Sequence, residues 1–237
     1  MSKKKTWLIV GIAVGAVLIA AAVVLFALIL PKQREQREWT QAVAEYRAAK
    51  IEQYEQENAR YADYEVEVAF LGDSLTDGYD LAKYYPQYVT ANRGIGGDTT
   101  YDLQGRLQVS VYDLKPKVAV MLIGANNPDT MLDNYEDILI GLRDNLPDTE
   151  VVLLSMTAMG GEHWGKWNQQ ACYNNVSIRL LAEKYGYTFV DLFTPLYDVE
   201  SGEVYEGYTV DGGHFTHEGY TAVTAQITPV LQNLLGK

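Results

Sequence analysis

Ser74 directly follows a short apolar run that is typical of a buried strand. The run covers residues 66–71 and contains β-branched side chains, and Gly72 and Asp73 separate it from the serine. At the turn between a strand and the following helix, a serine hydroxyl projects beyond the sheet edge. Its backbone N–H faces the crevice in which open α/β sheets bind ligands. A residue there can supply both a nucleophile and an oxyanion donor. A helix N-cap is the alternative interpretation, so a catalytic role requires partners elsewhere in the chain.

Asp211 and His214 lie ahead of the last expected helix, separated by two glycines. This spacing lets the carboxylate fold back onto the imidazole Nδ1, which fixes the tautomer and leaves Nε2 free to accept a proton. The other two histidines, His163 and His217, lack a carboxylate at a comparable spacing. A metal site built from both C-terminal histidines and Asp211 would be the alternative. It lacks a fuller set of ligands, so we expect no metal.

Two further strand ends offer hydrogen-bond donors. The segment 92–100 contains three glycines, the last of them Gly97, which allow close backbone approach and place an N–H near a helix start. The segment matches neither of the common phosphate-binding patterns. Asn126 follows the most apolar run, and a side-chain amide can donate to an oxyanion without adding a competing base. An Asx turn before Pro128 is the alternative for Asn126.

Together these segments resemble the SGNH, or GDSL, hydrolase superfamily. Its four blocks occur here in order as Gly-Asp-Ser-Leu at 72–75, a glycine block ending at Gly97, Gly-Ala-Asn at 124–126 and Asp-Gly-Gly-His at 211–214. Within the superfamily, the runs 94–100, 115–118 and 124–127 look closest to the branch that holds the catalytic subunits of platelet-activating-factor acetylhydrolase type I. Asn127 stands where most of the superfamily has aspartate, a departure that this branch shares.

The resemblance implies a role for each matching residue. Ser74 would be the nucleophile, His214 the general base and later the general acid, and Asp211 the group that orients and stabilises the imidazolium. The oxyanion hole would consist of the backbone N–H groups of Ser74 and Gly97 and the side-chain amide of Asn126. The implied reaction is ester hydrolysis through an acyl-enzyme, with no metal and no organic cofactor.

The elements that must position these residues alternate between strands and helices. Apolar runs typical of strands cover residues 66–71, 88–92, 118–123, 151–156 and 188–192. Helical segments cover residues 99–107, 134–145, 168–185 and 218–235. This alternation indicates crossover connections and a parallel sheet. We therefore expect a three-layer α/β/α domain with five strands in flavodoxin-like order.

An uncharged apolar run from Trp7 to Leu30 precedes this domain and follows the triplet Lys3–Lys5. As a helix the run would be about 36 Å long, enough to cross a hydrocarbon core of about 30 Å. It is longer than the core of a cleavable signal peptide, and no A-x-A-like site follows, so a signal anchor is favoured. The lysine triplet indicates that the domain lies outside the cell membrane, although Lys32, Arg34 and Arg37 add positive charge on the far side.

We divide the chain into an N-terminal anchor at residues 1–31, a helical stalk at 32–65 and a hydrolase domain at 66–237. The stalk is rich in Gln, Glu, Arg and Ala and contains neither Gly nor Pro between residues 33 and 64, which favours a helix. Arg47 and Asn58 interrupt its nearest approach to a heptad seam, so a solvated stalk is favoured over a strong coiled coil.

Charge and cysteine content exclude several functions. The formal net charge is −12, and an acidic surface repels nucleic acid, so no nucleic-acid partner is expected. Cys172 is the only cysteine, which excludes an internal disulfide and a cysteine-based metal cluster.

The sequence predicts a membrane-anchored serine esterase that cleaves short-chain esters, above all acetyl esters, on small molecules or O-acetylated glycans. An O-acyltransferase acting on an extracytoplasmic glycan and a non-catalytic binding module on the same scaffold are the alternatives. Aromatic residues in segment 160–167, Trp164 among them, either overhang the crevice or pack on the domain. The same two alternatives apply to Tyr205 and Tyr208. The branch resemblance suggests a homodimer.

Overall fold

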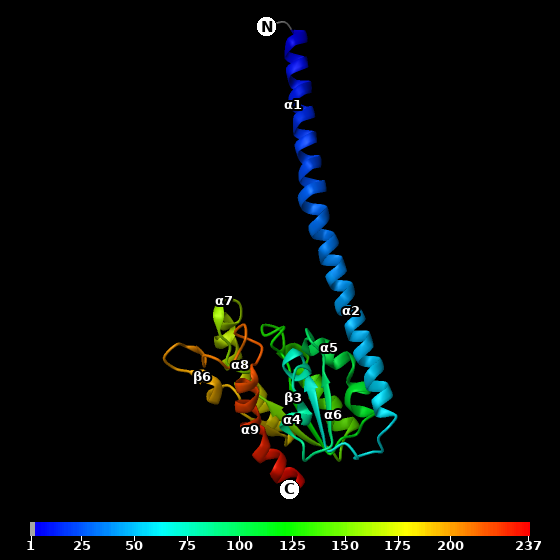
Figure 1. Ribbon diagram of the computed structural model, residues 1–237, viewed down its shortest axis with the longest axis vertical. Coiled ribbons are helices and arrows are strands. Elements are labelled where there is room, and N and C mark those ends of the chain that lie inside the picture. Colours follow the sequence, from blue (N-terminus) through cyan, green and yellow to red (C-terminus); the bar gives the residue numbers. More distant parts are fainter. Residues whose placement is uncertain (1–2) are drawn as a thin grey trace. The chain divides into compact units, whose positions relative to one another are not determined.

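The structure, a computed structural model, describes residues 3–237 and contains two compact units that divide between Ala49 and Lys50 (Figure 1). The N-terminal unit is helical. Helix α1 (Lys3–Val24) continues through a π-helical stretch (Leu25–Ile29) into α2 (Leu30–Asn58), whose last nine residues belong to the second unit. The expected stalk helix therefore ends at Asn58, before a series of turns.

Apolar side chains face outward around residues 13–24 of α1. Val17, Leu18 and Ile19 are consecutive and point in directions about 100° apart, yet each is about two-thirds exposed. In the part of the chain that the structure describes, one helix, near the N-terminus, is long and apolar enough to cross a membrane. A helix that is apolar on every side requires an apolar environment around it.

The second unit is built on a parallel sheet. Within the described residues its strands are β1 (Val68–Gly72), β2 (Thr90–Gly94), β3 (Val118–Leu122), β4 (Glu150–Leu154) and β5 (Thr188–Val190). They pair in the order β2-β1-β3-β4-β5. This confirms the five-stranded sheet in flavodoxin-like order. Every residue of β1 and β3 is buried, because both strands lie inside the sheet and are covered on both faces.

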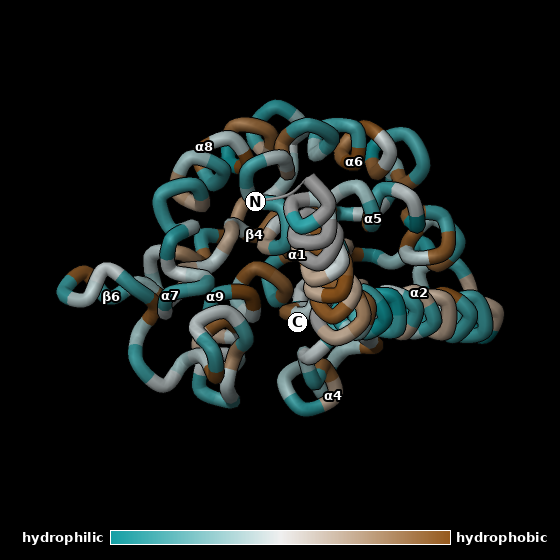
Figure 2. Tube along the Cα trace, turned by 90° about the horizontal axis from the view of Figure 1, so that it is seen from above, coloured by the Kyte–Doolittle hydropathy of each residue, from teal (hydrophilic) through white to brown (hydrophobic). Residues whose placement is uncertain are grey.

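Helices cover the two faces of the sheet. The buried side chains of α5 (Thr100–Gly105), α6 (Leu132–Asn145) and α8 (Asn168–Tyr185) pack on one face, and those of α9 (His217–Leu235) pack on the other. Figure 2 shows α6 and α8 on one side of β4 and α9 on the opposite side. The three-layer α/β/α architecture is thereby confirmed.

The structure differs from the sequence prediction in the extent of several elements. Strand β2 begins at Thr90 rather than at Tyr88, because the N–H of Tyr88 closes a turn onto the carbonyl of Tyr85. Two short helices, α3 (Ser74–Asp77) and α4 (Leu81–Tyr84), follow β1. A short helix α7 (Gly161–Trp164) and a hairpin of β6 (Tyr197–Asp198) and β7 (Glu203–Val204) were not expected either.

Candidate active site

Ser74 is the first residue of α3 and follows directly after β1 and Asp73. The N-cap of α3 is Asp73, whose Oδ1 accepts the N–H of Leu75 at 3.0 Å. The aspartate therefore does the capping, and the serine hydroxyl remains available for another partner. The turn is tight: a Cβ on Gly72 would lie 2.2 Å from the carbonyl oxygen of Leu122, so only glycine fits there.

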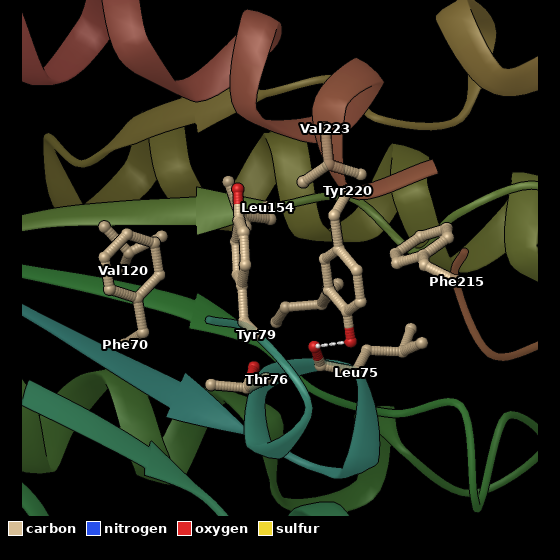
Figure 3. A pocket seen from close by; sticks show the side chains of 10 residues that line it. Phe70, Leu75, Thr76, Tyr79, Val120, Leu154, Phe215, Tyr220 and Val223 are labelled. Atoms are coloured by element: carbon tan, nitrogen blue, oxygen red, sulfur yellow. Dashed lines mark hydrogen bonds between the residues drawn. The ribbon is translucent and has the colours of Figure 1, made fainter. Parts of the chain in front are cut away.

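Aromatic side chains pack beside α3. Figure 3 shows Phe70, Tyr79, Tyr220 and Phe215 in a row beside α3. The rings of Tyr79 and Tyr220 stack with their centroids 4.8 Å apart, and the Tyr220 hydroxyl donates to the Leu75 carbonyl at 3.0 Å. Because Tyr220 belongs to α9, the last helix fixes the position of the short helix that carries Ser74.

His214 and Asp211 form a continuous chain of hydrogen bonds with Ser74. The His214 Nε2 lies 2.9 Å from the Ser74 Oγ, and its Nδ1 lies 2.8 Å from Asp211 Oδ2. Asp211 Oδ1 also accepts the backbone N–H groups of His214 at 2.8 Å and Gly213 at 3.0 Å. Burial alone would raise the pKa of Asp211, but these N–H groups and the imidazole outweigh it and hold the pKa well below its usual range. An ionised Asp211 favours the tautomer with hydrogen on Nδ1.

The loop with Asp211 and His214 packs tightly on the segment after β4. The N–H of Gly160 donates to the Gly212 carbonyl at 2.8 Å, and a Cβ on Gly212 would lie 1.9 Å from the Gly160 carbonyl oxygen. The Trp164 ring lies edge-on to the His214 ring with centroids 5.8 Å apart. A Cβ on Gly213 would lie 2.7 Å from that indole. The glycines in this loop therefore allow the close approach of two backbones and one indole.

A small pocket opens beside Ser74 and His214. Its other lining residues are Leu75, Ala125, Thr157, Met159, Trp164 and Gly213. The enclosed space is about 10 Å³, which is about the room that one water molecule needs. Of the aromatic residues considered from the sequence, Trp164 lines this pocket, and both Trp164 and Trp167 pack against the core cluster that contains the buried residues of α8. Tyr208 packs against the core cluster on the α9 face, and its ring contacts that of Tyr205.

The expected oxyanion donors lie in the glycine block and just after β3. Gly97 is exposed with φ of +83°, and no heavy atom of the described residues lies within 4 Å of the place its Cβ would take. A Cβ on the preceding Gly96 would lie 3.9 Å from the Ser74 Cβ, so the glycine block borders the serine. The Asn126 Nδ2 donates one hydrogen to the Asp98 carbonyl at 2.9 Å. Its second hydrogen remains available, since Asn126 is exposed.

A buried ion pair supports this donor side, and the sequence analysis did not identify it. Arg106 Nε donates to Asp98 Oδ2 at 2.7 Å, and the guanidinium also donates to the carbonyls of Gly72 and Arg93, both at 2.9 Å. Both charged side chains are almost completely buried. A single guanidinium thus joins the end of β1, the end of β2 and the glycine block. An acidic residue in the glycine block followed by an arginine in the next helix was the available signal.

Asn127 contributes to the same region by linking it to α6. Its Oδ1 accepts the N–H of Thr100 at 3.2 Å, and its Nδ2 donates to Thr100 Oγ1 at 3.0 Å. The Thr100 hydroxyl gives its own hydrogen to Asn134 Oδ1 at 2.7 Å. A carboxylate could not donate to that hydroxyl, which explains why this chain uses an amide at position 127.

Asp73 is a second carboxyl group close to Ser74, and it is buried. Burial raises the pKa of Asp73 from 3.8 to about 6; the Leu75 N–H opposes this shift, and the charge of Asp98 adds to it. The pKa values of Asp73 and Asp211, the two acids near Ser74, therefore lie on opposite sides of the value of an ordinary aspartate. Among the residues that the structure describes, no group of three histidine, cysteine or acidic side chains is placed to hold a metal ion.

With this geometry established, the chain can be compared with known proteins. Residues 70–222 match the GDSL-like lipase/acylhydrolase family. The chain belongs to that family. It is an ester hydrolase of the SGNH type, as the four sequence blocks predict. A search of curated proteins found no match.

Solved structures share the fold of this acylhydrolase. A Streptococcus pneumonia protein, provisionally assigned as a platelet activating factor, is 24% identical with a TM-score of 0.75, covering 84% of this chain and 99% of its own. A GDSL-like lipase from Bacteroides thetaiotaomicron is 25% identical with a TM-score of 0.69, covering 77% and 97%. A variant of Axe2, an acetyl xylan esterase from Geobacillus stearothermophilus, is 19% identical with a TM-score of 0.59, covering 71% and 95%.

The first of these matches extends beyond the segment predicted as the hydrolase domain. Residues 66–237 are 172 of the 237 residues, or 73% of the chain, which is less than the 84% covered by the Streptococcus pneumonia structure. The shared fold of this acylhydrolase therefore includes residues before Val66.

Proposed function

We propose that this acylhydrolase cleaves short-chain esters through a triad of Ser74, His214 and Asp211. The observation that carries the proposal is the unbroken chain of hydrogen bonds from Asp211 through the imidazole to the Ser74 hydroxyl. This arrangement couples a nucleophile, a base and an orienting carboxylate. The backbone N–H groups of Ser74 and Gly97 and the side-chain amide of Asn126 are the proposed oxyanion hole.

The first half-reaction forms an acyl-enzyme. The Ser74 Oγ attacks the acyl carbon, and its proton moves to His214 Nε2, 2.9 Å away. The carbonyl oxygen becomes an oxyanion that the three donors stabilise, while the Asp211 carboxylate stabilises the imidazolium. Collapse of this intermediate breaks the ester C–O bond, and the departing alcohol takes the proton from Nε2.

The second half-reaction releases the acid. Water attacks the acyl carbon while His214 Nε2 removes its proton, and collapse returns that proton to Ser74 Oγ as the carboxylic acid leaves. The side chains of His214 and Asp211 are 42% and 45% exposed, so water reaches this half of the site. This exposure supports hydrolysis over the alternative of acyl transfer, which requires a site that favours an acceptor hydroxyl over water.

The pocket beside Ser74 supports an acetyl group as the acyl portion. Its enclosed space of about 10 Å³ accommodates one small group, and the Leu75 and Met159 side chains are part of its wall. Trp164 lies at this pocket and presents an aromatic surface suited to a sugar ring or an apolar alcohol. The shared fold with an acetyl xylan esterase supports O-acetylated glycans as candidates beside small esters.

We also propose that the enzyme is anchored in a membrane. The helix near the N-terminus would cross the cell membrane once, and the Lys3–Lys5 triplet favours a catalytic unit on the extracytoplasmic side. A homodimer remains part of the proposal because of the sequence resemblance to the acetylhydrolase branch.

Hydrolysis of p-nitrophenyl esters by the full-length protein in detergent tests this function. We expect rapid cleavage of the acetate ester, a decline with longer acyl chains, and loss of nearly all turnover in Ser74→Ala. Ser177→Ala on α8 is the matched control, because its hydroxyl donates to the Tyr173 carbonyl within its own helix, and activity should be unchanged. Full activity of purified Ser74→Ala would overturn the proposal. Serine-dependent acetate transfer that appears only with an added sugar acceptor would replace hydrolysis by acyl transfer.

A further inference from the structure

The last nine residues of α2 belong to the same compact unit as the sheet. Within this stretch Tyr54 is 1% exposed and packs with Ile95 and Val109, with Ile51 at the edge of the same cluster. Ile95 is completely buried and lies in the middle of the glycine block. The end of α2 thus covers the apolar anchor of the loop that carries Gly97.

Polar contacts fix the same helix end to the last residues of β2. The Tyr54 hydroxyl donates to the Gly94 carbonyl at 2.6 Å in a buried setting. Arg93 is fully buried, and its guanidinium lies 4.6 Å from the centroid of the Tyr54 ring. The two terminal nitrogens of that guanidinium donate to Glu57 Oε2 at 2.6 Å and to Asn58 Oδ1 at 3.1 Å. The two Arg93 contacts are charge-assisted, and the guanidinium itself is excluded from water.

A third set of contacts joins α2, the Ser74 helix and the glycine block. Lys50 Nζ donates to Asp77 Oδ1 at 2.6 Å, and Asp77 Oδ2 accepts the Gly96 N–H at 3.0 Å. Asp77 is the last residue of α3, the helix that Ser74 begins, and Gly97 follows Gly96. A Cβ on Gly94 would lie 2.2 Å from the Asp77 nitrogen, so β2 and α3 are already in close contact.

We propose that residues 50–58 of α2 are a positioning element of the oxyanion hole, holding the Gly97 N–H at a fixed place relative to Ser74. The inference rests on the proposed function. The C-terminal end of the predicted stalk then belongs to the catalytic machinery. The helix that continues from the apolar N-terminal segment also positions the loop that carries Gly97. The likeness to the Streptococcus pneumonia structure, which extends to residues before Val66, is consistent with this assignment.

Physical reasoning sets the size of the effect. An oxyanion donor acts only if it meets the developing charge at hydrogen-bond distance, and a misplacement of about 1 Å can reduce a rate by about 10²-fold. Tyr54→Phe keeps the buried ring and removes one contact to the loop. We therefore expect kcat to fall by about tenfold while KM changes less than about twofold, because the donor acts on the transition state more than on the bound ester.

The test uses the full-length protein in detergent, assayed well below the unfolding temperature of every variant. Tyr187→Phe is the matched control for Tyr54→Phe. The Tyr187 hydroxyl also donates to a backbone carbonyl, at 3.3 Å, but that carbonyl belongs to Leu139 on α6, outside the loop that carries Gly97. Lys50→Met has Lys184→Met as its control, since Lys184 pairs with Glu136 on the surface. The two controls should keep the kcat of the unmodified protein even if their Tm falls.

A double variant separates positioning from plain destabilisation. If Tyr54 acts through the oxyanion hole, its effect on kcat should shrink when Tyr54→Phe is combined with Asn126→Ala, because the hole is then already impaired. Equal kcat for Tyr54→Phe, Lys50→Met and their controls would overturn the inference, as would a strictly additive double variant. Failure of the proposed function is distinct: there, ester cleavage would not depend on Ser74 at all.

Discussion

The two sides of the serine are built in different ways. On the donor side, Arg93, Asp98 and Arg106 are at most 4% exposed and are held by several charge-assisted hydrogen bonds. On the acid–base side, His214 and Asp211 are more than two-fifths exposed and are supported mainly by glycine-permitted backbone contacts. Donors that stabilise an oxyanion must be fixed before the reaction begins. In the proposed mechanism the histidine, in contrast, exchanges protons with alcohol and water, which favours an accessible place.

The buried ions explain how the donor side becomes rigid. Burying a charge destabilises the folded state unless the charge is paired and hydrogen-bonded. Loss of one partner therefore leaves the other as an unpaired buried charge, which is strongly destabilising. Arg106 donates to two backbone carbonyls, the Ser110 hydroxyl and one carboxylate, so moving any of them disrupts the whole network. The acid–base loop has no such network, and its geometry depends on space that glycines leave free.

Among variants that keep Ser74, the largest effect is expected from Asn126→Ala, which removes a proposed donor and its hydrogen bond to the Asp98 carbonyl but leaves the ion pair of Asp98 and Arg106 in place. We expect kcat to fall by about 10²–10³-fold, with little change in Tm, because Asn126 is exposed. Asn127→Ala at the neighbouring position serves as the comparison. Asn127 is buried and forms hydrogen bonds with Thr100, so the Tm of this variant should fall clearly. Ester kinetics and thermal unfolding of both variants check this. Wild-type kcat in Asn126→Ala would remove that residue from the oxyanion hole.

A smaller effect is expected from Gly212→Ala on the acid–base side. Its Cβ would collide with the Gly160 carbonyl, and φ at this position is +91°. The loop must shift, carrying Asp211 and His214 with it, and we expect kcat to fall by about tenfold or more.

Gly207→Ala separates the collision from the backbone strain. Gly207 has φ of +83°, but no heavy atom of the described residues lies within 4 Å of its Cβ position. Both variants carry the left-handed strain of about 1–2 kcal/mol, and only Gly212→Ala displaces the loop. Similar kcat values for the two variants would show that the close contact does not hold the acid–base pair in place.

The contrast between the two sides also shows what the sequence could predict. The sheet order followed from the alternation of apolar runs and helical segments, and Asp211 and His214 share a short loop whose spacing suffices to bring them together. The contact of Tyr54 with Gly94 links residues 40 apart through packing, and no local pattern encodes it. The sequence alone also could not predict which residue caps α3. Asp73 and Ser74 are both good N-caps, and the backbone geometry decides between them.

The smallest expected effect is a change of stability with pH, and it comes from Asp73 and Asp211, the two aspartates near Ser74. Burial raises the pKa of Asp73 to about 6, so the folded state favours its neutral form. Its stabilising contribution is complete below pH 3.8 and is lost as the pH rises through about 6. Asp211 behaves in the opposite sense: its lowered pKa contributes stability above the ordinary value, and that stability is lost in acid.

Thermal unfolding of Asp73→Asn and Asp211→Asn between pH 4 and pH 8 measures this opposition. Relative to the unmodified protein, Asp73→Asn should gain stability as the pH rises from 4 to about 7, because the unmodified protein then carries a buried charge that the amide lacks. Asp211→Asn should be destabilised throughout that range, since it loses an ionised acceptor of the His214 and Gly213 N–H groups. A pH-independent difference for Asp73→Asn would mean that its carboxyl group is ionised in the folded protein at pH 4. In that case the donor side would hold a further stabilised charge besides those of Arg93, Asp98 and Arg106, and the two sides of the serine would differ in packing but not in how they treat an acid.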